Sequence, residues 1–471
     1  MPPRITRGAC PDFEITTDVA IVGAGACGLV AALKARSEGA DVVVLERDPT
    51  PSGSTAMSSG FIPAPGTRFQ RSIGVDDDDP VRFADDIQRK SRNQSQAALT
   101  KLVAKTISPA LEWLADAHGL QWIVLDDFLY PGHTRHRMHA VPEKTGEALM
   151  TRLLQSASAA GVTIVCDAQA TTLHLDQNDY VSGLTFSRPG GQLEQLGCEA
   201  LILACNGYGG NASMVGQHIP EIANGLYYGH AGNQGDAVLW GEEMGAATAH
   251  LSGYQGHGSV AHPHNILITW AIMMEGGIQV NLNGQRFSNE HGGYSEQAAS
   301  VLAQPQGLAW NIYDARIHDF ALGFPDYFGA SQSGAIICAD SLKDLAAISG
   351  LPADALQNEL AELRELSRTD RTDPYGRRFS DKPPLEPPYY AVKVTGALFH
   401  TQGGLLVDDQ ARVLRLDGST CTNLFAGGGA ACGVSGPDKS GYLSGNGLLT
   451  AVALGFRAGA CAAMAPQSMS K

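Results

Sequence analysis

The glycine pattern near the start of the chain is the feature that most restricts its fold. Residues 18–48 read as a strand, a glycine turn, a helix over 26–37 and a second strand over 41–45. Gly23, Gly25 and Gly28 form a GxGxxG pattern directly after the first strand. The first glycine permits a tight turn, the second lets a pyrophosphate approach the backbone, and the third lets helix and strand pack closely. The segment therefore predicts a βαβ unit in a parallel sheet.

A carboxylate and a polar segment sharpen the interpretation of this turn. Glu46 ends the second predicted strand, 18 residues after Gly28, where a carboxylate can bind ribose hydroxyls. The plainer alternative, a tight turn that holds no ligand, does not explain this placement. The Gly/Ser/Thr-rich stretch "GSTAMSSG" (53–60) follows soon after and supplies hydroxyls and amides along a pyrophosphate and a ring. A dinucleotide site is predicted, with FAD favoured over NAD.

Length and composition limit the other possibilities. A chain of 471 residues is too long for one compact core, so we expect two domains. The formal net charge of −15 disfavours nucleic acid and anionic membranes as partners. Nine scattered cysteines without a CxxC pair argue against a metal site or a disulfide framework. No run of about twenty apolar residues and no signal-peptide pattern is visible. We expect a cytoplasmic protein without a membrane span.

Further segments outline the rest of the chain. Helix and strand alternate over 147–176, and strands follow at 180–186 and 198–207. Two hairpins are predicted, one over 276–290 with its turn at Asn283-Gly284 and one over 403–414. The proline-rich segment 382–392 is typical of a domain boundary. A last helix is expected over 447–463.

Several motifs together resemble one flavoprotein family. They are "IVGAGACGL", "GSTAMSSG", "LILACNGYGGN" (201–211), "GNQGDAVLW" (232–240), "GGIQVNLNGQRFSNE" (276–290), "HTQGGLLVD" (400–408), "NLFAGGGAACGVSG" (423–436) and "SGNGLLTAVALGFRAG" (444–459). Over nearly its whole length the chain resembles the fumarate reductase/succinate dehydrogenase flavoproteins, which include the 3-ketosteroid dehydrogenases. The resemblance implies an α/β fold, a Rossmann-like FAD-binding domain of the GR2 flavoprotein type with an inserted α+β capping domain. We expect residues 1–252 and 397–471 to form the FAD-binding domain and residues 253–396 the capping domain.

The same motifs indicate which residues hold FAD. The candidates are Gly23, Gly25, Ala26, Gly28, Glu46, Arg47, Ser54, Thr55, Ser59, Gly60, Ala168, Asn206, Gly207, Asp236, Asn446 and Leu448. The family often has a glutamate after "LFA", whereas this chain has three glycines at 427–429. No histidine lies within "GSTAMSSG", so covalent attachment of FAD is not indicated.

The substrate residues depart from the dicarboxylate pattern of the family. Fumarate reductases of this family clamp a dicarboxylate with two arginines and two histidines, and one arginine also delivers a proton. Counting from the motifs, the arginine positions fall at Tyr294 and Tyr442, and the histidines at His400 and, with a weaker anchor, His257. A phenol can donate to a ketone oxygen or exchange a proton, but it cannot hold a carboxylate as a charged fork. The tyrosine pair, with Ser444 in "YLSG", resembles the 3-ketosteroid dehydrogenases, closest to the Δ4-(5α) type.

These observations lead to an expected function and to alternatives. The resemblance implies an FAD-dependent oxidoreductase that introduces or reduces a C=C bond next to a carbonyl of a steroid-like or smaller cyclic ketone. Hydride transfers at flavin N5, the tyrosines serve as acid, base and hydrogen-bond donor, and an external electron donor or acceptor completes the cycle. The alternatives are a dicarboxylate or tricarboxylate oxidoreductase and a non-catalytic flavin carrier. In the first, Arg135, Arg137 or Arg286 would replace the missing arginines. Each candidate side chain also has a plain packing interpretation.

Overall fold

The computed structural model describes residues 3–8 and 11–465, and these divide into two compact units. Unit 1 comprises residues 1–219, 229–254 and 400–471 within that described range, and unit 2 comprises residues 220–228 and 255–399. Each unit has its own hydrophobic core.

Unit 1 is built around a large sheet with helices packed on it. Its elements are β1 (Arg4–Arg7), β2 (Thr16–Val22), α1 (Ala26–Ser37), β3 (Val42–Leu45), α2 (Gly53–Ala56), β4 (Ile62–Pro63), α3 (Arg68–Ser72), α4 (Pro80–Lys90), α5 (Ala97–His118), β5 (Ile123–Leu125), β6 (Met138–Ala140), α6 (Gly146–Ala159), β7 (Thr163–Val165), β8 (Gln169–Leu175), β9 (Val181–Ser187), β10 (Leu193–Leu203), α7 (Ala212–His218), α8 (Asp236–Glu243), β12 (Thr248–Ala249), β19 (Gly404–Leu405), β20 (Arg412–Leu414), β21 (Thr420–Ala426), η4 (Gly428–Ala430), η5 (Lys439–Gly441) and α15 (Asn446–Ala462).

The main sheet of unit 1 contains the predicted βαβ unit at its centre. Its strand order is β1-β8-β9-β10-β2-β3-β7, and β21 also pairs with β10. The pairs β10–β2, β2–β3, β3–β7 and β10–β21 are parallel, as a doubly wound fold requires. Carboxyl ends of parallel strands meet at one edge, and the turn after β2 and the end of β3 therefore lie close together.

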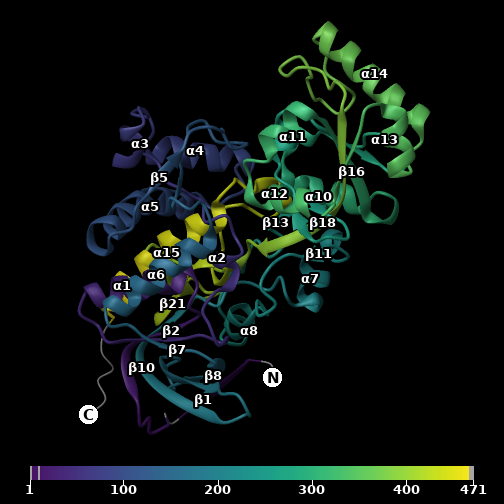
Figure 1. The fold of residues 1–471 in the computed structure, drawn as a ribbon. Helices are drawn as coiled ribbons and strands as arrows, with labels where there is room; N and C mark the ends of the chain where they lie inside the picture. Colours follow the sequence, from purple (N-terminus) through teal and green to yellow (C-terminus); the bar gives the residue numbers. More distant parts are fainter. Residues whose placement is uncertain (1–2, 9–10, 466–471) are drawn as a thin grey trace. The chain divides into compact units, whose positions relative to one another are not determined.

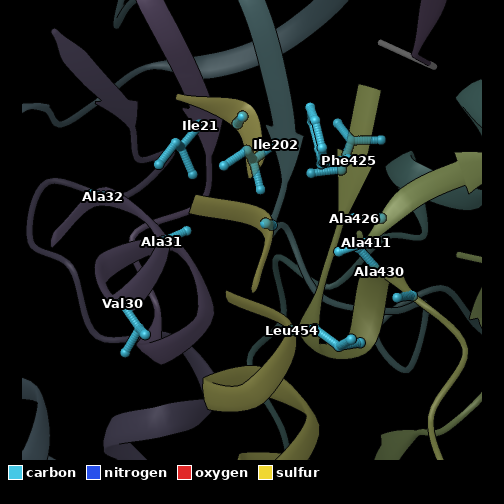
Figure 2. Close-up of a cluster of buried hydrophobic side chains, with 14 of the residues drawn as sticks. Ile21, Val30, Ala31, Ala32, Ile202, Ala411, Phe425, Ala426, Ala430 and Leu454 are labelled. Carbon is cyan, nitrogen blue, oxygen red and sulfur yellow. The ribbon is translucent and has the colours of Figure 1, made fainter. Parts of the chain in front are cut away.

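The core of unit 1 joins this sheet to two helices. Figure 2 shows Ile21 and Ile202 from neighbouring strands, Val30 from α1 and Leu454 from α15 among its buried side chains. Helix α15 packs along α1, as Figure 1 also shows. A Cβ atom at Gly459 would lie 2.2 Å from the carbonyl oxygen of Ala31. The small residues of the last helix therefore permit a close helix crossing.

Unit 2 is an α+β body around a mixed sheet. Its elements are η1 (Pro220–Ile222), β11 (Leu226–Tyr227), β13 (Tyr254–Ala261), β14 (Ile266–Leu267), α9 (Ala271–Met274), β15 (Ile278–Asn281), η2 (Glu290–Gly292), α10 (Tyr294–Leu302), η3 (Pro305–Gly307), β16 (Leu308–Asp314), α11 (Ala315–Ala321), α12 (Pro325–Gln332), β17 (Ile336–Ala339), α13 (Leu342–Ser349), α14 (Ala353–Thr369) and β18 (Tyr389–Thr401). The strand order is β14-β13-β18-β16-β15, with β11 and β17 also paired to β18.

One predicted hairpin differs from the structure. The turn at Asn283-Gly284 forms, since the Gly284 amide donates to the carbonyl of Asn281 at 2.9 Å. The return strand does not form, and β15 pairs instead with β16. The reason lies in Arg286, whose side chain is buried by ion pairs with Glu290 and Asp373 and draws residues 285–290 out of the sheet.

Among residues 3–8 and 11–465, no helix combines the length and the apolar character that crossing a bilayer requires.

Candidate active site

The turn between β2 and α1 is shaped by its glycines. Gly23 has φ +104°, and a Cβ atom there would lie 2.5 Å from the carbonyl oxygen of Ala204. At Gly28 a Cβ atom would lie 1.9 Å from the carbonyl oxygen of Gly23. At Gly25 the nearest atom is the Thr55 hydroxyl, at an ordinary 3.5 Å. The outer two glycines are thus required by packing, while Gly25 leaves the backbone open to a ligand.

Glu46 and Thr55 hold the same turn from two sides. The Glu46 carboxylate is buried, accepts from the Ala24 amide at 2.9 Å and from the Asp48 amide at 3.1 Å. The Thr55 hydroxyl accepts from the Ala26 amide at 3.1 Å. Gly25 has no side chain to cap α1, so apart from the Ala26 amide the N-terminus of the helix suits an anion.

The remaining predicted cofactor residues surround this turn within unit 1. Ser54 Oγ accepts from Asn206 Nδ2 at 3.0 Å and from Asn233 Nδ2 at 2.9 Å. At Gly207 a Cβ atom would lie 2.0 Å from the Thr401 hydroxyl. Arg47 donates to the Gly232 carbonyl, and the Ala168 amide donates to the Glu46 carbonyl at 2.8 Å. Ser59 is exposed, whereas Gly60 is buried with φ +72°. Asp236 begins α8, and Leu448 lies half-buried in the first turn of α15. Burial raises the pKa of Asp236 above its usual range.

The glycine run at 427–429 has a steric cause in this structure. A Cβ atom at Gly427 would lie 2.6 Å from the Cys27 sulfur, and one at Gly429 would lie 2.1 Å from Asn206 Oδ1. Gly428 has φ +59°, in the left-handed region that favours glycine. A glutamate in this run would therefore collide with its neighbours.

A chain of hydrogen bonds in unit 1 orients His400. Asn446 Nδ2 donates to Ser435 Oγ at 3.0 Å, Ser435 Oγ donates to Gln402 Oε1 at 2.6 Å, and Gln402 Nε2 lies 2.9 Å from His400 Nδ1. Because the Gln402 amide donates to it, His400 Nδ1 is an acceptor, and the ring proton is on Nε2. The carbonyl of Thr401, 3.1 Å from the same Nδ1, would accept from the other tautomer, so the Gln402 amide decides between the two.

The residues at the two ends of this hydrogen-bond series, His400 and Asn446, lie in different environments. Burial lowers the pKa of His400 to about 4, so the ring is neutral near pH 7. A Cβ atom at Gly447 would lie 2.7 Å from His400 Nε2, which explains the glycine there. At the other end, Asn446 is fully buried and its Oδ1 has no hydrogen-bond partner among the described residues.

Tyr442 lies in a tightly packed glycine turn beside His400. The two ring centroids are 5.7 Å apart with an edge-on arrangement, and the Tyr442 side chain is buried. A Cβ atom at Gly441 would lie 1.7 Å from the carbonyl oxygen of Ser435. Ser444 is buried in the same turn, and its carbonyl oxygen accepts from His133 Nε2 at 3.0 Å. The turn thus fixes the tyrosine beside the histidine that the motifs paired with it.

The other two candidates, His257 and Tyr294, lie together in unit 2. The His257 ring stacks on Tyr294 with centroids 5.0 Å apart and on Phe399 at 5.3 Å, and Trp270 meets it edge-on at 5.7 Å. Tyr294 is the first residue of α10 and follows Gly293, whose φ is +138°. His257 Nδ1 accepts from the Ser259 amide at 3.2 Å, which leaves the proton on Nε2. Burial lowers the pKa of His257 to about 3.

The arginines that the sequence left available are paired with carboxylates. Arg137 is fully buried between Asp78 at 2.8 Å and Asp86 at 2.5 Å. Arg286 is equally buried between Glu290 at 2.6 Å and Asp373 at 2.5 Å. Burial alone would raise the pKa of Glu290, but Arg377 and Arg286 outweigh it and hold the pKa at about 2. Arg135 pairs with Asp77 in a partly exposed position.

Comparison with known proteins identifies the family. The family model described as "FAD binding domain" matches residues 18–448. The chain belongs to this family. The cofactor it implies fits the structure: Gly25 leaves room for a pyrophosphate, the N-cap residues of α1 and α15 are glycines without a capping side chain, and Asn446 Oδ1 is a buried acceptor in need of a donor. The protein is therefore an FAD flavoprotein.

Fumarate reductases and ketosteroid dehydrogenases are both among the similar proteins. The flavoprotein is 28% identical to a probable fumarate reductase, Ifc3, of Shewanella frigidimarina, over 97% of this chain and 76% of that protein. It is 27% identical to a 3-oxosteroid 1-dehydrogenase of Mycobacterium tuberculosis, over 89% and 93%. Its fold is similar to that of 3-ketosteroid-Δ4-(5α)-dehydrogenase from Rhodococcus jostii, with a TM-score of 0.78, 24% identity, and coverage of 98% and 100%. The chain is an FAD-dependent oxidoreductase of the fumarate reductase/ketosteroid dehydrogenase family.

Sequence reasoning did not single out several residues of this flavoprotein's candidate site. Gln402 and Ser435 lie inside quoted motifs, and their hydrogen-bonding capacity was a signal that could have been used. His133 stands in "GHTRHRMH" (132–139), but nothing in that motif points to Ser444. Trp270 and Phe399 carry no local signal, because their contact with His257 arises from strand and helix packing.

Proposed function

We propose that this flavoprotein introduces or reduces a C=C bond next to the carbonyl of an uncharged cyclic ketone, with 3-ketosteroids as the leading substrate class. The proposal rests on the absence of two arginine side chains from the expected substrate positions. Tyr294 and Tyr442 stand where dicarboxylate-reducing relatives are expected to have arginines. A charged, bidentate guanidinium is the group that holds a carboxylate tightly, and a phenol does not replace it.

The charge state of the candidate residues supports an uncharged substrate. Arg137 and Arg286 are each held by two carboxylates, and releasing a buried arginine from its partners is costly. His257 and His400 have pKa values lowered by burial to about 3 and about 4, so neither is a cation near pH 7. Of the three arginines considered, Arg135 alone keeps about a third of its side chain exposed.

Unit 2 adds an argument for a ring-shaped, apolar substrate. The cluster of His257, Trp270, Tyr294 and Phe399 presents aromatic faces and edges, and Tyr228 continues it by stacking on Phe399 at 5.1 Å. Aromatic surfaces of this kind bind flat or fused rings by dispersion and area burial. We propose that unit 1 holds FAD and that unit 2 is the capping domain predicted over 253–396.

The proposed chemistry assigns a task to each residue. Bound FAD supplies the hydride acceptor or donor at N5. The Tyr442 hydroxyl donates to the substrate carbonyl and stabilises the negative charge that develops on its oxygen. His400, with its proton on Nε2, is a second neutral donor on the same side of unit 1. Tyr294 takes or returns the proton at carbon, with the neutral His257 ring packed against it, and Ser444 lies in the turn that holds Tyr442.

The test uses holoenzyme and a panel of 3-ketosteroids, cyclohexanones and cyclohexenones, fumarate and citraconate. We expect a ketone, and neither dicarboxylate, to bleach or reoxidise the flavin. Tyr442→Phe removes one hydroxyl without loss of volume, so FAD should stay bound while turnover falls by about 10²–10³, as for loss of an oxyanion donor. Tyr294→Phe should be at least as severe. Near-normal turnover by Tyr442→Phe would contradict the proposed role.

The rival function is reduction of a dicarboxylate or tricarboxylate, and the similarity to the Shewanella protein named a probable fumarate reductase favours it. Arg135 is then the cation to test, because its pair with Asp77 is exposed and weak. Turnover of fumarate that is lost in Arg135→Gln would support this function and exclude the ketone. If the ketone proposal is right, Tyr442→Arg should abolish ketone turnover.

A further inference from the structure

Unit 2 also contains a groove. It lies between α14 and the proline-rich segment that precedes β18. Its apolar floor is formed by Leu360, Leu363, Phe379 and Leu385. None of the residues assigned to FAD or to the ketone lines it.

Cationic side chains line the same groove. They are Arg364, Arg377, Arg378 and Lys382, with Asp381 as an acidic member. Each cation has a carboxylate partner: Glu386, Glu290, Asp370 and Glu275 respectively. These four carboxylates are not among the lining residues. The groove is therefore lined by the cationic members of these ion pairs, and an anionic ligand in the groove would contact them.

Arg377 is an independent indication of a ligand. The residue is 2% exposed, and its Nη atoms donate to Glu290, to Gly277 and to the carbonyl of Met273. Its Nε has no hydrogen-bond partner among the described residues, although it is buried. Burial is the largest influence on this guanidinium and lowers its pKa. A buried donor without an acceptor is costly, and an acceptor brought by a ligand would remove that cost.

We propose that this groove is a binding site for an organic carboxylate with an apolar body. The carboxylate meets Arg364 and Arg377 at the cationic wall, and the apolar body covers the leucine and phenylalanine floor. The site goes beyond the proposed oxidoreductase function and does not depend on it.

Ligand binding in the groove would also affect the segment that contains Tyr294. His291 is part of the groove wall, and its Nε2 lies 3.1 Å from the carbonyl of Met273, which also accepts from Arg377. Gly292 and Gly293 separate His291 from Tyr294 along the chain. Ordering the groove wall would therefore restrict the start of α10.

The experiment titrates holoenzyme with 4-phenylbutyrate by calorimetry, with the uncharged 4-phenylbutyramide as the matched ligand. We expect saturable binding of one carboxylate, and at least about tenfold weaker binding of the amide, since a charge-assisted pair is lost. Arg364→Gln should weaken phenylbutyrate binding about tenfold for the same reason. Leu363→Trp, which fills the groove, should abolish it.

Arg368→Gln is the matched control, because Arg368 lies on the same helix, pairs with Glu365 and does not line the groove. The Arg368→Gln variant should bind phenylbutyrate with the same affinity as the wild type. Hydrogen exchange of the holoenzyme should slow over 276–293 and 360–385 when phenylbutyrate is added. No saturable binding, equal binding of acid and amide, binding unchanged in Arg364→Gln and Leu363→Trp, or slowed exchange confined to 400–447 would each overturn the proposal.

Discussion

His133 connects a histidine-rich loop to the turn that holds Tyr442. Its Nε2 donates to the Ser444 carbonyl at 3.0 Å, and its Nδ1 accepts from Arg137 Nη1 at 3.3 Å. Arg137 is itself fixed by Asp78 and Asp86. Burial lowers the pKa of His133 to about 3, so one tautomer with a single donor is present near pH 7. We infer that His133 positions the turn and does not act on the substrate.

Replacing His133 tests this positioning role. His133→Leu leaves the buried Ser444 carbonyl without its donor, which should cost about 1–3 kcal/mol in the free energy of unfolding. We expect turnover per bound FAD to fall about tenfold with the panel's best ketone, through kcat more than KM, as positioning losses do. His133→Gln, which keeps a donor, should recover part of the loss, and the neighbouring His136→Leu should keep wild-type turnover. Wild-type kcat in His133→Leu would contradict the inference.

The crossing of α1 and α15 determines how two glycine turns meet in unit 1. A Cβ atom at Gly455 would lie 2.5 Å from the Cys27 carbonyl oxygen, and one at Gly459 would lie 2.2 Å from the Ala31 carbonyl oxygen. The backbones of the two helices are therefore in direct contact at these glycines. Since α1 begins at the cofactor turn and α15 follows the Tyr442 turn, this contact sets the spacing of both turns.

Gly459→Ala tests the helix contact. The added methyl must push the helices apart, and overpacking of this kind costs about 1–3 kcal/mol. We expect a lower urea midpoint and a reduced FAD content after purification. Gly216→Ala is the matched control, because Gly216 lies in α7 with no atom within 4 Å of the added Cβ. Alanine there should be neutral or stabilising by about 0.5–1 kcal/mol. Equal midpoints for Gly459→Ala and wild type would argue against a required close contact.

Buried neutral histidines make the stability of the folded protein depend on pH. Burial lowers the pKa of His139 and His400 to about 4, and that of His133 and His257 to about 3. In the unfolded chain a histidine takes up its proton near pH 6.5. The unfolded state thus binds more protons between about pH 4 and pH 6.5. The stabilisation is fully present above pH 6.5 and is lost as the pH falls through that window.

His139→Gln separates one contribution to this pH dependence. His139 is fully buried between the Thr67 hydroxyl and the Arg137 carbonyl. One such group adds at most about 1.4 kcal/mol for each pH unit in the window. We expect the slope of the thermal midpoint against pH, between pH 5 and 6.5, to be shallower in His139→Gln than in wild type. His264→Gln, at an exposed position, should keep the wild-type slope. An unchanged slope in His139→Gln would contradict a neutral buried ring.

Local chemistry was enough to predict the βαβ unit around the first glycine turn. The GxGxxG turn requires glycines at 23 and 28 whatever surrounds it, so β2, α1 and β3 lie close to their predicted ranges. The motifs assigned both Tyr442 and His400 to the substrate, and the structure brings their rings within 5.7 Å of each other. The prediction of a hairpin over 276–290 was wrong. Its turn can be predicted from neighbouring residues, whereas the ion pairs of Arg286 with Glu290 and Asp373 depend on the tertiary structure.

Contacts between distant segments could come only from the tertiary structure. Phe399 meets His257 because the pairing of β13 with β18 brings together residues more than a hundred positions apart. The hydrogen bond from His133 to Ser444 joins residues 311 positions apart. The sequence left Arg137 and Arg286 available to bind an anion, and the fold pairs both with buried carboxylates. Local patterns specify turns, periodicity and the chemistry of single side chains, whereas burial and partner choice depend on which distant segments pack together.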